Sequence, residues 1–247
     1  MPLDYPQRRQ NLVYGGKSGF IGYLMIRPPG PWRMYWKTLE GLVLWMDFNQ
    51  CQAIDLSGHG NNGTIYGAQC VQGRSGRALS FDGVDDYVDC GNDTSLNPKE
   101  ITISVWLNLP MRLVDYPDSY WAGIVYKGTK GEERQYGCRI HGDFDAIDCH
   151  VQGVDGFAWA HLHDDDIPPP NTWFLLTITY DSSGLKAYVN DILKETFAYQ
   201  GDIVTKPHNL FLGQEETLDY LKGTIDEVRI YNRALSEEEI KWLYEHT

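Results

Sequence analysis

The sequence predicts an all-β fold, a two-sheet antiparallel sandwich with an extended N-terminal arm and a short C-terminal helix. The 247 residues include 16 Tyr, 8 Trp and 25 Gly, a composition typical of short strands joined by tight turns. Apolar residues occupy every second position of residues 101–109, as in a strand with one buried face. A sandwich of this length commonly forms one domain, so the length does not require two.

Residues 1–40 differ from the rest and form the predicted arm. They contain Gly15-Gly16 and a Pro28–Pro31 cluster, which interrupt regular structure, and six basic residues against two acidic ones, a net +4. The whole chain carries −13, which leaves −17 for residues 41–247. We expect the arm to dock onto an acidic surface of another protein subunit, for instance a second copy in a homo-oligomer. The alternative is a solvated or locally packed leader.

From residue 41 onward the pattern predicts a series of short strands and one late helix. In order, the strands are expected at 41–48, 64–66, two within 78–88, 101–109, 123–126, 136–141, 146–152, 173–180, 185–189, 192–196, 209–212 and 223–231. Asn190-Asp191 predicts a tight hairpin turn, because both residues tolerate positive φ. Ser236 and Glu239 form a capping box that opens the C-terminal helix.

The last strand contains an unexpected acid. Regular alternation places Asp226 on the same face as Val228 and Ile230, and Glu227 on the opposite face. A carboxylate among apolar neighbours needs a partner, so Asp226 is a candidate for a structural or functional role.

Five cysteines suggest two disulfides. Cys138 and Cys149 are symmetric about a predicted hairpin turn at residues 142–145, a pairing that also sets Arg139 opposite Asp148. Cys51 and Cys70 flank the polar loop 55–63 in the same manner.

In an oxidising environment we expect the disulfides Cys138–Cys149 and Cys51–Cys70, with Cys90 left free. The alternative is five buried thiols, which behave as small apolar side chains.

The order of these blocks resembles a known family. Residues 42–48, 55–63, 76–83, 85–88, 103–106, 173–181, 187–190 and 222–247 are similar to successive blocks of the laminin-G-like jelly roll, of the concanavalin A-like lectin/glucanase group. The resemblance covers residues 41–247 in order and none of the arm. It implies a jelly-roll domain over residues 41–247.

The loop 55–63 and the last strand are the best candidates for a calcium site. Calcium takes six to eight oxygen ligands, and the loop offers carboxylate, amide and carbonyl oxygens. The resemblance assigns this role to Asp55, Asn62 and Asp226, with Gly60 as a carbonyl ligand, and implies a structural Ca²⁺ that joins the two ends of the domain. The alternative is an Asx-turn loop in which Asp55 accepts hydrogen bonds from backbone N–H groups.

Aromatic residues in two long connecting segments form a candidate ligand surface. Tyr116, Tyr120, Trp121 and Trp159 can stack against sugar rings. His161 and His163 share one strand face beside carboxylates, where they can bind a sugar hydroxyl or a transition metal. The alternatives are core packing, protein–protein contact and an exposed polar loop.

Catalysis has little support in the sequence. The related glucanases carry alternating acids on one strand face, whereas the adjacent Asp226 and Glu227 are expected on opposite faces. Motifs for serine hydrolases, zinc proteases and phosphate loops are absent.

We therefore expect a non-enzymatic surface protein that is docked by its arm onto a larger assembly such as a virion, as a decoration or fibre protein, and that also binds glycans. The alternatives are a secreted carbohydrate-binding lectin module and a glycoside hydrolase or polysaccharide lyase. The acidic body excludes nucleic acid, and no run of 18 apolar residues exists, so we expect no membrane insertion. The expected location is extracellular or the virion surface. No secretion signal is recognised, so we expect either that a leader has been removed or that the protein leaves the cell by another route, for instance inside a virus particle.

Overall fold

The structure is a computed structural model that describes residues 31–129, 134–215 and 219–247. The arm prediction for residues 1–30 lies outside these residues. The helices are α1 (Pro31–Lys37) and α2 (Glu237–His246). The strands are β1 (Leu42–Met46), β2 (Thr64–Tyr66), β3 (Gln69–Gln72), β4 (Arg77–Asp82), β5 (Tyr87–Asp89), β6 (Ile101–Asn108), β7 (Trp121–Gly128), β8 (Arg134–His141), β9 (Ala146–Gly153), β10 (Gly156–His163), β11 (Phe174–Tyr180), β12 (Gly184–Val189), β13 (Ile192–Ala198), β14 (Leu210–Leu212), β15 (Gln214–Glu215), β16 (Asp219–Tyr220) and β17 (Lys222–Tyr231).

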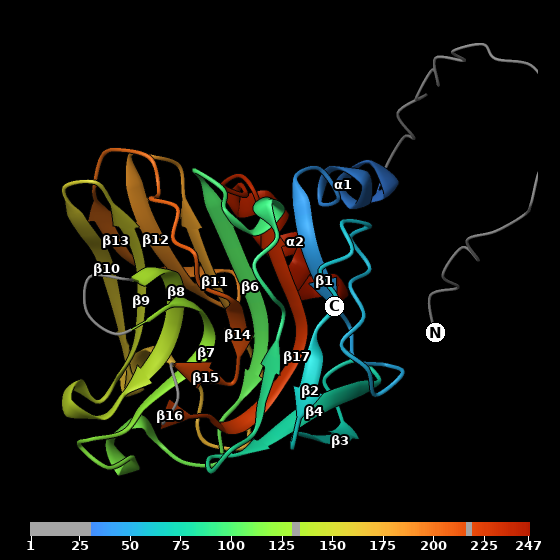
Figure 1. Cartoon of the computed structure of the whole chain (residues 1–247), viewed down its shortest axis with the longest axis vertical. Helices are drawn as coiled ribbons and strands as arrows, with labels where there is room; N and C mark the ends of the chain where they lie inside the picture. The colour runs from blue at the N-terminus through green and yellow to red at the C-terminus, as the bar shows by residue number, and fades with distance from the viewer. Residues whose placement is uncertain (1–30, 130–133, 216–218) are drawn as a thin grey trace, which may run out of the picture.

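The strands form the predicted antiparallel sandwich (Figure 1). One sheet has eight strands in the order β13-β12-β11-β6-β17-β4-β3, with β1 also paired to β17. The other has seven strands in the order β10-β9-β8-β7-β14-β5-β2. None of the described helices is long and apolar enough to cross a membrane.

Apolar side chains fill the space between the two sheets. The predicted face of β6 lies there, since Ile101, Ile103, Val105 and Leu107 are buried in this core. A smaller cluster covers the outer face of the eight-stranded sheet, where Trp106, Leu175 and Tyr231 pack against Ile240 and Leu243 of α2. The cluster with α2 therefore lies on the eight-stranded sheet, and the other outer face of the sandwich is formed by the seven-stranded sheet.

Residues 31–37 are helical, although the Pro28–Pro31 cluster was expected to interrupt regular structure. Pro31 begins α1, at the position where a missing N–H and a fixed φ are tolerated in a helix. The helix packs on α2: the rings of Tyr35 and Trp242 lie 5.8 Å apart, and Lys37 Nζ is 3.7 Å from Glu239. The capping box of Ser236 and Glu239 is confirmed.

Both predicted disulfides are present. Cys51 is bonded to Cys70 and Cys138 to Cys149, while Cys90 is free and buried. The predicted register of the β8–β9 hairpin is also confirmed, because Arg139 pairs with Asp148. Disulfides of this kind persist in oxidising compartments, so the folded domain belongs outside the reducing cytoplasm.

Alkylation of the unfolded chain should count these bonds. We expect iodoacetamide in denaturant to add to one cysteine, Cys90, without reductant, and to all five after reduction. Intact mass measures the difference. Addition to five cysteines before reduction would show that neither bond forms.

A β-bulge in β17 breaks the alternation expected for the last strand. Opposite β6, the register advances by three residues on β17, from Asp226 to Arg229, but by two on β6. Glu227 takes a positive φ of 51° at this point. As a result Ile225 and Val228 both face the core, whereas simple alternation places them on opposite faces. The bulge coincides with a change of partner, since β17 pairs first with β4 and then with β1.

Candidate functional site on the seven-stranded sheet

The β8–β9 hairpin presents polar and aromatic side chains to the outer face of the seven-stranded sheet. Cys138 and Cys149 point into the core. Their neighbours Arg139 and Asp148 therefore point outward, because successive side chains in a strand alternate. On β10 the same rule sets Trp159 outward, since Ala158 and Ala160 belong to the core.

Four rings on this face form a partly exposed surface, which we call the tryptophan platform: Trp121, Phe144, Trp159 and His161. Phe144, in the β8–β9 turn, is 58% exposed, and the two tryptophans are half-buried. The rings of Trp159 and His161 are nearly parallel, with an interplanar angle of 8° and centroids 6.3 Å apart. Phe144 lies edge-on to His161 at 6.3 Å. A half-exposed ring surface of this kind suits a ligand with one apolar and one polar side.

A buried carboxylate orients two imidazoles at the platform. Asp148 is 1% exposed, and its two oxygens lie 2.5 Å from Nδ1 of His141 and 2.7 Å from Nδ1 of His161. When Nδ1–H of His161 donates to Asp148, its Nε2 is left as a hydrogen-bond acceptor, whereas Nε2 of the buried His141 lies 3.6 Å from the Asp143 carboxylate. The ring of His141 also packs edge-on against Trp121 at 4.6 Å and Phe144 at 4.3 Å.

A buried arginine fixes the two tryptophans from below. The Arg139 guanidinium lies 4.8 Å from the ring centre of Trp121 and 5.6 Å from that of Trp159. Its Nη1 bonds both carboxylate oxygens of Glu215, at 2.7 and 3.1 Å. Burial raises the pKa of Glu215, and Arg139 opposes that rise. This ion pair holds β15 against the sheet over Gly123, where any larger side chain would collide with the backbone of Gln214.

His150 lies fully buried beside the platform with neither ring nitrogen hydrogen-bonded. The centre of its ring lies 4.8 Å from that of Trp159 and 5.3 Å from that of Tyr126. Gly137 pairs with both Tyr126 and His150 in the sheet, and because it has no side chain the two rings can meet across it. Burial and the charges of Arg139 and Arg134 hold the pKa of His150 well below its usual range, so the ring is neutral. His150 therefore places two uncharged ring nitrogens beneath Trp159, at the buried side of the tryptophan platform.

The structure brings three of the six predicted ligand residues together, namely Trp121, Trp159 and His161. The other three lie elsewhere. Tyr116 is 4% exposed and, with its stacked neighbour Tyr120, hydrogen-bonds the backbone of residues 220 and 222, so both rings support the start of β17. His163 is exposed at the end of β10, where its N–H donates to Asp166, so the partner of His161 is His141 rather than His163.

Sequence reasoning missed the polar layer and the most exposed ring of the site: Arg139, His141, Phe144, Asp148 and His150. The signal was present, because the inward cysteines of the hairpin imply an outward Arg, His and Asp at alternate positions. The expected strands 136–141 and 146–152 already contained four of these residues.

The loop predicted to bind calcium is held by its own hydrogen bonds. The Asp55 carboxylate accepts from Trp45 N at 3.1 Å, from Ser57 N and Oγ at 2.8 Å each, and from Asn61 N at 2.9 Å. Asn62 Oδ1 accepts from Asp55 N at 2.8 Å. Gly60 has a φ of 83° in this loop. These bonds give both carboxylate oxygens hydrogen-bond donors, which is the arrangement of the Asx-turn loop named above as the alternative to calcium.

Asp226 is held by a different part of the chain. Its carboxylate accepts from Ser75 N at 3.0 Å and from Glu227 N at 2.8 Å, so it fastens the β3–β4 turn to β17. The calcium site stays a prediction. Coordination by these residues requires the melting temperature to fall in EGTA and recover in Ca²⁺, whereas the hydrogen bonds alone require no change.

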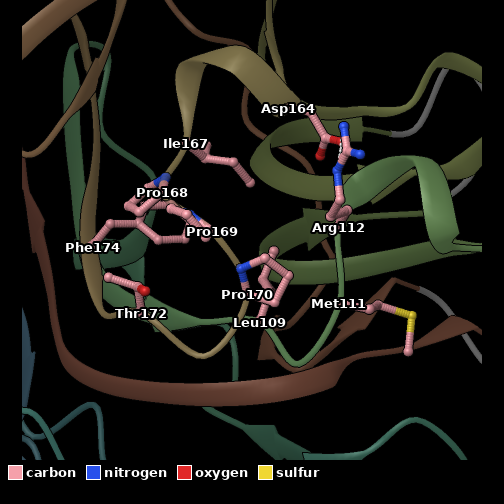
Figure 2. A pocket seen from close by; sticks show the side chains of 10 residues that line it. All are labelled: Leu109, Met111, Arg112, Asp164, Ile167, Pro168, Pro169, Pro170, Thr172 and Phe174. Carbon is pink, nitrogen blue, oxygen red and sulfur yellow. Dashed lines mark hydrogen bonds and ion pairs between the residues drawn. The ribbon is translucent and has the colours of Figure 1, made fainter.

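A separate cavity of about 300 Å³ lies between the end of β6 and the segment before β11. Pro168, Pro169, Pro170 and Leu109 supply much of its lining (Figure 2). Its charged groups, Arg112 and Asp164, bind each other at 2.8 Å. Aliphatic walls with a closed ion pair offer a sugar few partners, so the platform is the better candidate site.

The fold and the platform define a lectin-like β-sandwich. The family model described as the Concanavalin A-like lectin/glucanases superfamily matches residues 82–241, and the chain belongs to this superfamily. A search of curated protein sequences found no match.

Solved structures share the fold at low sequence identity. Domain 4 of AbnA, a GH43 extracellular arabinanase from Geobacillus stearothermophilus, solved in complex with arabinotriose, is 19% identical with a TM-score of 0.64; the match covers 82% of this chain and 98% of that one. The binding domain of Paraclostridial Mosquitocidal Protein 1 is 18% identical with a TM-score of 0.68, covering 84% and 52%. The botulinum neurotoxin serotype D ligand binding domain, solved with N-acetylneuraminic acid, is 16% identical with a TM-score of 0.68, covering 86% and 52%. The chain thus spans about half the length of these toxin domains. The two disulfides indicate an oxidising environment, which agrees with an extracellular location.

Proposed function

We propose that this chain is a carbohydrate-binding module that holds a glycan on the tryptophan platform. The observation that supports this proposal is the juxtaposition of the half-buried Trp121 and Trp159 rings with two imidazoles fixed by Asp148. Sugar C–H faces stack on the rings, while a hydroxyl group donates to Nε2 of the partly exposed His161. Solved relatives of the same fold carry arabinotriose or N-acetylneuraminic acid, which agrees with this use of the fold.

The charges at the platform favour a neutral glycan. Arg139 is already bound to Glu215 and lies 3.6 Å from Asp148, so its charge is compensated. The exposed charge at the platform edge is acidic, since Asp143 accepts from Trp121 Nε1 and its side chain is 43% exposed. Hydroxyl groups can donate to such a carboxylate, whereas an anionic sugar would be repelled.

A binding role without catalysis agrees with the burial and the bonding partners of the nearby carboxylates. Glycoside hydrolysis needs two carboxyl groups that flank one bond. Asp148 and Glu215 are each no more than 2% exposed and are engaged with cationic or polar partners. Their carboxylates orient the binding side chains instead.

Replacing Trp159 by alanine should lower glycan affinity at least about tenfold, because a stacked ring face is lost. Because Trp159 also packs on Arg139 and His150, the 58% exposed Phe144 provides a second variant, and Phe144→Ala should weaken binding without lowering the melting temperature. Binding is measured by isothermal titration with the best oligosaccharide from an array of neutral and sialylated glycans. The exposed Trp36→Ala on α1 is the matched control and should leave affinity unchanged. Unchanged affinity in both platform variants, or binding to sialylated glycans alone, would contradict the proposal.

Docking of residues 1–40 onto a virion or another assembly remains a separate prediction. Because residues 34–40 pack against the C-terminal segment, for example through Lys37 and Glu40 carbonyls bound by Arg233, a deletion that tests it should end at residue 30. Light scattering before and after that deletion reports any change of assembly.

A further inference from the structure

We infer that the same outer face carries a second carbohydrate-contacting surface, formed by Tyr66, Tyr87 and Phe211, which we call the tyrosine surface. The inference rests on the proposed function and adds the class of ligand: a polysaccharide long enough to engage two separate surfaces of one sheet.

The tyrosine surface continues the seven-stranded sheet beyond β7. β14, β5 and β2 follow β7 in the strand order. Val88 and Leu212 point into the core, so their neighbours Tyr87 and Phe211 point outward. Phe211 pairs with Tyr126, and Tyr66 pairs with Tyr87, which sets these rings on the same side of the sheet as the tryptophan platform.

The rings present an open aromatic face. Tyr66 and Tyr87 are stacked with centroids 4.5 Å apart and an interplanar angle of 14°, and Phe211 meets Tyr87 edge-on at 6.0 Å. Tyr87 covers one face of the Tyr66 ring, and Tyr66 is still 45% exposed. Stacking on Tyr87 holds the Tyr66 ring in one orientation before a ligand arrives, which reduces the entropy lost on binding.

Hydrogen-bond acceptors lie beside these rings. Asp89 is opposite both Phe211 and Thr64 in the register, and Asn209 Nδ2 holds its two oxygens at 3.0 and 3.1 Å. An ordered, partly exposed carboxylate next to an aromatic face can accept from sugar hydroxyls, the role proposed for Asp143 at the first platform. The second surface therefore repeats the chemistry of the first.

The outermost rings of the two surfaces are too far apart for one short oligosaccharide to contact both. Trp159 on β10 and Tyr66 on β2 are separated by six strand-to-strand intervals, or about 29 Å at ~4.8 Å each. Between them β15 lies across β7 at Gly123, held by Glu215. A polymer that binds one surface raises the local concentration of its other segments at the second, so its affinity gains from both.

The test compares a polymer with its own short fragment. Soluble arabinan, xylan, galactan and mixed-linkage glucan are screened by affinity electrophoresis, and the trisaccharide of the polymer that binds is titrated. We expect Tyr66→Ala to weaken polysaccharide binding about tenfold or more, while the trisaccharide affinity at the first platform changes by less than about twofold. Because Tyr66 is exposed on an edge strand, its removal should not unfold the domain. Tyr66→Phe, which keeps the ring, should behave as the parent, and Trp36→Ala is again the control.

Each outcome separates the two proposals. If Tyr66→Ala leaves polysaccharide affinity unchanged while Trp159→Ala and Phe144→Ala lower it, the tyrosine surface is not a glycan surface and the first platform stands. If neither Trp159→Ala nor Phe144→Ala has an effect but Tyr66→Ala does, the assignment of the first platform is wrong. Binding to no glycan of the array and no polymer of the panel removes both.

Discussion

Replacing Arg139 by methionine is expected to lower the free energy of unfolding by about 3 to 5 kcal/mol. Arg139 is 3% exposed, and its guanidinium is the cation bound by the buried carboxylate of Glu215. Methionine keeps much of the side-chain volume but leaves Glu215 buried without a cation. Since burial already raises the pKa of Glu215, the carboxyl group should then take up a proton.

Arg112 provides a matched control for this substitution. It also binds a carboxylate at 2.8 Å, that of Asp164, but its side chain is 57% exposed. Arg112→Met should therefore cost less than about 1 kcal/mol. Urea unfolding followed by tryptophan fluorescence measures both variants. If Arg139→Met cost no more than Arg112→Met, the buried pair would not stabilise the sheet face.

Asp226 should make stability fall as the pH rises from about 4 to about 7. Burial raises the pKa of Asp226 to about 7, from an ordinary value of 3.8. The folded state thus holds a proton on Asp226 that the unfolded chain releases at lower pH. The stabilisation is complete below the unfolded value and is lost as the pH passes through the folded one. A shift of this size corresponds to at most about 4 kcal/mol.

The variant Asp226→Asn isolates this contribution. An amide replaces one acceptor oxygen by a donor that faces a backbone N–H, so the variant has a constant cost at every pH. The difference in unfolding free energy between variant and parent should nevertheless change with pH in the variant's favour from pH 4 to pH 8. Urea titrations in EGTA across this range measure it. A difference that stays constant would show that Asp226 is ionised throughout.

Local regularity decided which parts of the fold could be predicted from the sequence. The β8–β9 hairpin is symmetric about its turn, so the Cys138–Cys149 disulfide and the Arg139–Asp148 register followed from spacing alone. The bulge at Asp226 could not be predicted in this way, because alternation assumes one residue opposite one residue. Its positive φ falls on Glu227, a residue type that gives no warning of a left-handed conformation.

The site depends on strand order, which spacing does not reveal. Trp121, Trp159 and His161 come from β7 and β10, and they share one face only because β8 and β9 pair between these strands in the order β7-β8-β9-β10. Tyr116 and Tyr120 are aromatic residues of the same kind in the same connecting segment as Trp121, yet they pack under β17. Composition alone could not separate the two groups, because the direction of each ring follows from tertiary packing.

The place of β17 in the sheet sets the order in which the domain can assemble. This strand is synthesised after all the other described strands, and yet β6, β4 and β1 all pair with it. While the ribosome still holds residues 222–231, β1 lacks its neighbour and the two halves of the eight-stranded sheet remain unjoined. Closure then requires contacts between residues nearly 190 apart in the chain, such as the Leu42–Tyr231 pair, and contacts of that separation form slowly. The nascent chain therefore exposes its core-forming strands until residues 222–231 have been made, a period in which chaperones and disulfide exchange can act on it.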